Sequence, residues 1–102
     1  MDNYQKEAME FRTETATELY ALLNLGAEAG EVLGKVAKHI RDNGDPAVLR
    51  QNIKKELGDV MWMVAAVASD FGLTLSEICE DNLTKLNSRK ERNVISGSGD
   101  NR

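Results

Sequence analysis

The chain has 102 residues, of which 41% are hydrophobic, 29% are charged and 5% are aromatic. This length leaves room for one domain, and the few aromatics favour helices over a sheet. A formal net charge of −4 gives no basic footprint for a nucleic-acid polymer, whose binding requires clustered Lys and Arg. Because there is one cysteine and no signal-peptide pattern, we expect a cytoplasmic protein. The longest apolar run, 60–68, is about half of a membrane span, so no membrane segment is expected.

The first two helices are expected over 3–11 and from near residue 16 to Asn43-Gly44. Thr15 and Glu18 match a capping box, in which each side chain satisfies a free backbone N–H at a helix start. Apolar residues of the second helix then recur at steps of three and four, which predicts one continuous apolar stripe. The stripe consists of Leu22, Leu25, Ala29, Val32, Val36 and Ile40.

The third helix is expected to start at Asp45-Pro46, because Asp accepts from free N–H groups and Pro suits the first helical position. Between residues 60 and 68 this helix is apolar all round, which one face of a small bundle cannot explain. We therefore expect burial against another subunit. The apolar positions are Leu49, Ile53, Leu57, Val60, Val64, Val67 and Phe71.

The fourth helix is expected after Gly72, from a second capping box at Thr74 and Glu77 to about Arg89. The segment 93–102 contains Ser-Gly-Ser-Gly and is predicted to be a flexible tail to a domain over 1–92. The sequence thus predicts an all-α, antiparallel bundle of about four helices, completed by oligomerisation.

Two pairs of acidic residues stand out. Glu28 and Glu31 lie one turn apart on the second helix, and Glu56 and Asp59 do so on the third. Each pair borders the apolar stripe of its helix, so antiparallel packing would bring the pairs together at the rim of the core. Four carboxylates there would repel one another unless a counter-charge lay between them. Hard divalent cations, Mg²⁺ or alternatively Mn²⁺, suit such oxygen ligands. Ordinary solvated helix carboxylates are the competing interpretation.

These motifs resemble those of MazG-like members of the all-α nucleotide pyrophosphohydrolase superfamily. The likeness rests on Glu28-Ala-Gly-Glu31 followed by Glu56-Leu-Gly-Asp59-Val. It extends from Asn3-Tyr4-Gln5 to 82–89 and so covers nearly the whole chain. The tail 97–102 looks like the ending of one subgroup, which often has Gly where this chain has Asn93. Asn tolerates a left-handed backbone better than most residues, so the departure is minor.

The resemblance implies antiparallel helices assembled as dimers or dimers of dimers (a homotetramer), with active sites shared between subunits. It also implies that Glu28, Glu31, Glu56 and Asp59 hold Mg²⁺ while water attacks the α-phosphorus of a nucleoside triphosphate, releasing pyrophosphate. Glu31 is our candidate for the general base, and Glu56 is expected to be essential for hydrolysis. The implied role is house-cleaning or control of deoxynucleotide pools.

Substrate contacts are expected from the fourth helix, where Asn82, Lys85 and Arg89 form a polar stripe suited to phosphate, sugar or base. A solvated surface is the alternative for this stripe. Trp62 could stack on a base or pack in the core. Tyr4 and Gln5 match the start of the family and could contact the nucleoside, although Tyr4 could equally be a packing residue.

Three other functions remain open from the sequence. Phosphoribosyl-ATP hydrolysis is an activity of the same superfamily. A non-catalytic helical interaction module would make the acidic pairs incidental. An oxidative di-iron carboxylate bundle is the third, but its sites use a Glu three residues before a His. Here Val36 lies three residues before His39, which disfavours this function.

Overall fold

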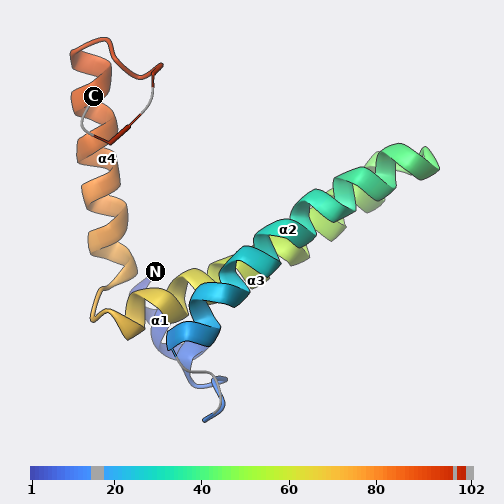
Figure 1. Cartoon of the computed structure of the whole chain (residues 1–102), viewed down its shortest axis with the longest axis horizontal. Helices are drawn as coiled ribbons and strands as arrows, with labels where there is room; N and C mark the ends of the chain where they lie inside the picture. The colour runs from blue at the N-terminus through green and yellow to red at the C-terminus, as the bar shows by residue number, and fades with distance from the viewer. Residues whose placement is uncertain (15–17, 98, 101–102) are drawn as a thin grey trace.

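The computed structural model of the chain describes residues 1–14, 18–97 and 99–100, and its helices appear in Figure 1. In chain order they are α1 (Asp2–Met9), α2 (Glu18–Asp42), α3 (Pro46–Asp70) and α4 (Leu75–Glu91). The described residues contain no strand, so the predicted all-α class is confirmed. The capping box predicted at Thr15 and Glu18 lies outside the described residues.

The two long helices α2 and α3 run antiparallel and make the main contact of the fold (Figure 1). Their tight connection forms where Asn43 takes a left-handed φ of 48° and the Gly44 N–H donates to the His39 carbonyl over 3.1 Å. The Asp45 side chain then accepts from the Ala47 N–H (2.8 Å), and Pro46 occupies the first helical position. The predicted turn and helix start are therefore confirmed.

The packed core lies where the end of α3 meets α1 and the start of α4. Ala65, Ala68 and Leu75 form its buried centre, with Met9 and Ile78 packed against them. Small alanines let the three helices approach closely at this corner. Within one chain, Met63, Ala65, Ala66 and Ala68 of the apolar run of α3 are buried, whereas Met61 is 37% exposed.

The last helix leaves this corner and stands away from the hairpin (Figure 1). Gly72 has a φ of 69°, and a 100° bend separates α3 from α4. The second predicted capping box is confirmed, since the Glu77 N–H donates to Thr74 Oγ1 (3.2 Å) and the Thr74 N–H donates to Glu77 Oε1 (2.7 Å). A single chain therefore does not close the bundle around α4.

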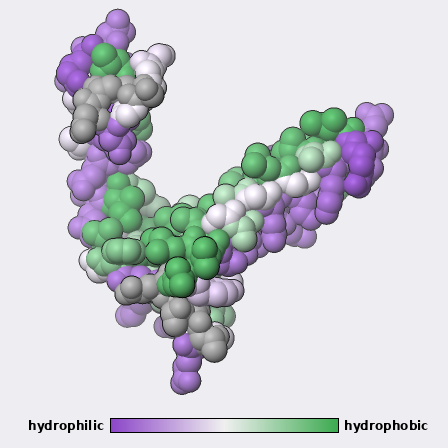
Figure 2. Space-filling model, viewed as in Figure 1, coloured by the Kyte–Doolittle hydropathy of each residue, from purple (hydrophilic) through white to green (hydrophobic). Residues whose placement is uncertain are grey.

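The apolar stripe of α2 is wider than the contact with α3 can cover. Leu25, Val32 and Val36 are half-buried, whereas Leu22 and Ile40 are 45% and 73% exposed. Figure 2 shows hydrophobic residues along the outer edge of the hairpin.

Within the described ranges, none of the helices alone combines the length and the hydropathy that a membrane span requires. The helices α3 and α4 meet the criteria of length and hydropathy only when they are taken together, and a bend of 100° separates them.

Candidate active site

Three of the four predicted carboxylates meet where α2 and α3 pack together. Glu28 and Glu31 come from α2 and Glu56 from α3, and each can offer an oxygen within 4.8 Å of the other two. They form the carboxylate cluster. Antiparallel packing brings the two helices' acidic turns to the same level, as the sequence predicted.

The cluster contains two buried carboxylate oxygens that no hydrogen bond in the described chain satisfies. Oε2 of Glu28 and Oε2 of Glu56 are buried and accept no hydrogen bond from any described residue. The nearest partners are Asn24 Nδ2, 3.4 Å from Glu28 Oε1, and Lys35 Nζ, 3.8 Å from Glu56 Oε1. Because buried, unpaired carboxylate oxygens are costly, this arrangement suits a bound cation. Oxygen donors of this kind fit Mg²⁺ or Mn²⁺.

The electrostatics of Glu56 support the same interpretation. The pKa of Glu56 is raised, first by its hydrogen-bonding contact with Glu31, then by burial and by the negative charge of Glu31. Lys35 and Lys38 act in the opposite direction on this pKa. A shared proton or a bound cation between Glu31 and Glu56 would relieve the repulsion between their carboxylates.

The fourth predicted ligand, Asp59, does not belong to this group of described residues. It is exposed and lines a hollow of about 430 Å³ between α1 and α3, together with Tyr4, Glu7, Phe11 and Trp62. The pKa of Tyr4 is raised by burial and then by the charge of Asp59. In this structure Asp59 thus faces the aromatic hollow instead of the carboxylate cluster.

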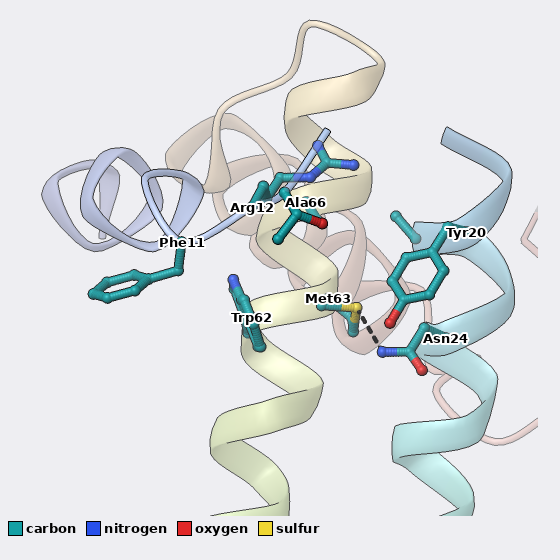
Figure 3. Close-up of a pocket in the computed structure, with 9 residues that line it drawn as sticks. Phe11, Arg12, Tyr20, Asn24, Trp62, Met63 and Ala66 are labelled. Atoms are coloured by element: carbon teal, nitrogen blue, oxygen red, sulfur yellow. Dashed lines mark hydrogen bonds between the residues drawn. The ribbon is translucent and has the colours of Figure 1, made fainter. Parts of the chain in front are cut away.

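Trp62 stands between this aromatic hollow and a second one. Its indole N–H donates to the Ala8 carbonyl (3.1 Å), which fixes the ring in a half-buried position. The second hollow measures about 200 Å³, and Figure 3 shows Phe11 and Arg12 on one side and Tyr20 and Asn24 on the other. A ring bordering two hollows can both pack against the chain and offer a face to a base.

Gln5, predicted to contact the nucleoside, makes its side-chain hydrogen bonds within the chain. It is 8% exposed, and its amide NH₂ donates to Ser69 Oγ (3.0 Å) and to the Leu73 carbonyl (2.9 Å). Its Oε1 accepts from the Leu75 N–H (2.9 Å). Because both of its donor protons are used within the chain, Gln5 ties α1 to the connection between α3 and α4.

The predicted phosphate-binding residues of α4 lie on the helix that stands away from the hairpin. Asn82 is exposed, whereas Arg89 is 5% exposed. Arg89 Nη2 donates to the Asp100 carbonyl (3.0 Å), and Asp100 Oδ1 accepts from Lys85 Nζ (3.3 Å). The described part of the tail therefore folds back onto α4, where Asn93 takes the left-handed φ of 58° that Asn tolerates. The pKa of Asp100 is lowered by Lys85 and Arg89.

Two lysines beside the cluster were missed by the sequence analysis. Lys35 and Lys38 follow Glu31 by four and seven residues, which places all three on one side of α2. That spacing could have indicated that the two lysines lie near the cluster. From sequence alone, however, they look like ordinary surface residues, because the position of Glu56 relative to them depends on the packing of α3.

The sequence of this chain is similar to those of known proteins. A relative from Mycobacterium phage L5, described as "Gene 37 protein", is 48% identical over 86 residues, which cover 81% of this chain and 75% of the relative. No solved structure matches the chain. The family described as "MazG nucleotide pyrophosphohydrolase domain" matches residues 15–94, which include all four predicted carboxylates. The chain belongs to this MazG nucleotide pyrophosphohydrolase family.

Proposed function

We propose that this protein uses Mg²⁺ to hydrolyse a (deoxy)nucleoside triphosphate to a monophosphate and pyrophosphate. The observation that carries the proposal is the carboxylate cluster, where two buried carboxylate oxygens accept no hydrogen bond within the described chain. Membership of the family suggests nucleotide pyrophosphohydrolase activity and agrees with a cluster built for a cation. We further propose a cytoplasmic role in house-cleaning or deoxynucleotide pool control.

In the proposed reaction a water oxygen forms a bond to the α-phosphorus, and the bond to the bridging oxygen breaks. Pyrophosphate leaves with the electron pair, and the water proton passes to a carboxylate, for which Glu31 is the candidate. A bound Mg²⁺ would neutralise phosphate charge and lower the pKa of water, with Glu28, Glu31 and Glu56 as its ligands. Asp59 could join them by a change of side-chain rotamer, because it lies one turn beyond Glu56.

The aromatic hollow is the proposed nucleoside site. Trp62, Tyr4 and Phe11 supply apolar and aromatic surface, and Asp59, which follows Glu56 by one turn of α3, also lines the hollow. A base stacked there would leave its phosphates to extend toward Glu56. Gln5 holds the wall of this hollow in place instead of touching the substrate.

We also propose that the protein works as a dimer or a dimer of dimers. Leu19, Leu23 and Leu33 of α2 are 66%, 68% and 72% exposed in the single chain, and water would be excluded from them by a second copy. Lys85 and Arg89 lie on α4, away from the carboxylate cluster of their own chain. We therefore propose that they act at the carboxylate cluster of a second copy.

Product analysis tests the reaction. Incubating the protein with Mg²⁺ and a panel of common and modified deoxynucleoside triphosphates, with phosphoribosyl-ATP included, should release pyrophosphate and a monophosphate. Release of inorganic phosphate and a diphosphate would contradict the proposal. If no compound turned over, and Mg²⁺ with a nucleotide analogue did not raise the melting temperature, a non-catalytic interaction module would be favoured.

Mixing two inactive variants tests the shared site. If α4 acts on the partner, Glu56→Gln and Arg89→Ala chains should complement each other after mixing and re-association. For a symmetric dimer the recovered activity would be about a quarter of the wild-type value. No recovery, with both variants folded and co-assembled, would show that each chain builds its site alone.

A further inference from the structure

An open groove of about 380 Å³ runs along α2 beside the carboxylate cluster. Its α2 residues recur at steps of three and four, so they share one face of the helix. At Gly30 and Gly34 no heavy atom lies within 4 Å of the position a Cβ would take, so the missing side chains leave the groove open. The lining includes Gly30, Glu31, Gly34, Lys35 and Lys38 of α2, and Glu56 of α3.

The residues that line this groove carry charges of both signs. Glu31 and Glu56 are acidic, and Glu56 Oε2 is buried without a partner in the described chain. Lys35 and Lys38 follow Glu31 along the same side of α2, one turn apart from each other. Lys35 contacts both Glu56 and solvent, because its Nζ is 3.8 Å from Glu56 Oε1 and its side chain is 35% exposed.

A magnesium polyphosphate has the complementary arrangement, with a cation next to anionic oxygens. We propose that Lys35 and Lys38 bind phosphate oxygens of the leaving pyrophosphate, next to the carboxylates that hold the metal. The inference rests on the proposed function and assigns these two residues to the β- and γ-phosphates of the substrate. Their positive charge would stabilise the negative charge that develops on the leaving group.

This assignment gives the phosphates a site within the same chain as the carboxylates. Lys85 and Arg89, by contrast, stand on α4 and are engaged by Asp100. The groove needs no movement of α4, since all its lining residues belong to the hairpin. Lys35 would exchange a long contact with Glu56 for a phosphate oxygen once a cation neutralises that carboxylate.

Calorimetry with magnesium pyrophosphate as the probe tests the inference. We expect Lys35→Ala/Lys38→Ala to weaken binding by about tenfold for each lysine removed, because contacts to charged phosphate oxygens are strong. The matched control is Lys54→Ala/Lys55→Ala, which makes the same change of net charge at two exposed lysines of α3 outside the groove. The control should bind pyrophosphate as the wild type does.

A second variant fills the groove without removing charge. Gly34→Leu adds a Cβ at a position that no heavy atom approaches within 4 Å, so we expect the fold to tolerate the substitution. We expect an unchanged or higher melting temperature, because Gly is a poor helix former, together with at least tenfold weaker pyrophosphate binding. Titration with Mg²⁺ alone should give wild-type affinity in the lysine variants, as the carboxylates remain.

Several outcomes would overturn the inference. They are equal pyrophosphate affinity in Lys35→Ala/Lys38→Ala and wild type, an equal loss in both double-lysine variants, or no binding by the wild type. A different outcome would separate the two proposals: the wild type hydrolyses no nucleotide, and pyrophosphate binding is lost only in the groove variants. The proposed reaction would then be wrong, and the groove assignment would stand.

Discussion

The two ends of α3 show how this small protein separates stability from chemistry. Near its C-terminal end, α3 packs against α1 and α4, and the polar groups of Gln5 are satisfied there. In its N-terminal half, α3 packs against α2, and Glu56 keeps a buried oxygen without a partner in the described chain. The first end holds the chain together, whereas the second is left incomplete for a ligand.

The same contrast holds for apolar surface. Ala65, Ala66 and Leu75 at the packed corner are at most 2% exposed, whereas Leu33 and Ile40 on the hairpin are 72% and 73% exposed. A single chain therefore buries the apolar residues of the packed corner and leaves large apolar residues of the hairpin in water. The outer hairpin is where a partner would add most to stability.

The largest expected effect comes from Glu56→Gln, which removes a carboxylate from the incomplete end. Hydrolysis should fall by at least about a hundredfold, because a metal ligand is lost. In the metal-free protein the melting temperature at neutral pH should rise, since the neutral amide relieves repulsion from Glu31. Pyrophosphate release and a thermal melt check the two halves of this prediction.

Two comparisons sharpen the Glu56→Gln result. Glu80→Gln changes an exposed residue of α4 and should leave both quantities unchanged. Because the folded-state pKa of Glu56 is raised, metal-free wild type should lose stability as pH rises from the ordinary Glu pKa through that raised value. Glu56→Gln should lack this loss. A Glu56→Gln protein that remained active, or that melted at a lower temperature than the wild type, would contradict this prediction.

The second prediction concerns the exposed apolar edge. Leu33→Glu/Ile40→Glu should weaken self-association by about a hundredfold, because each large apolar side chain contributes about 1.5–3 kcal/mol on burial. Sedimentation over a dilution series measures the effect, and helical circular dichroism checks the fold. Lys54→Glu/Lys55→Glu is the control on α3. A wild type that is monomeric at every concentration would contradict the prediction.

The third prediction tests the packed corner. Arg12 and Asp70 form a two-pronged ion pair at 2.7 and 3.2 Å, with side chains 16% and 13% exposed. Asp70→Asn should lower the free energy of unfolding by about 1–3 kcal/mol, because a charge-assisted contact is lost in a partly buried site. Denaturant titration measures this, with exposed Glu10→Gln as control. Mg²⁺ affinity should not change, whereas a parallel loss would show that the two ends are coupled.

The smallest expected effect is at the start of α4. Thr74→Ala removes the capping box and should lower the free energy of unfolding by about 1 kcal/mol. Thr84→Ala, at an exposed interior position of the same helix, should be neutral or slightly stabilising. Equal effects of the two substitutions in denaturant titration would mean that the cap contributes nothing to the corner.

Local features were predictable because their causes lie within a few residues. The turn at Asn43 and Gly44, the N-cap at Asp45 and the capping box at Thr74 each depend on hydrogen bonds spanning two to five residues. The acidic turns of α2 and α3 could also be paired from sequence, since a short connection makes antiparallel neighbours. Membership of the family agrees with that pairing.

The sequence by itself determined four helices, the start signals of α3 and α4, and the carboxylate pattern, because periodicity and capping are local properties of the chain. Only the tertiary structure decided that Gln5 holds a corner with partners 64 to 70 residues away, that Asp59 faces an aromatic hollow, and that Lys35 comes near Glu56. These placements depend on how whole helices are rotated and crossed against one another. No short stretch of sequence encodes that geometry.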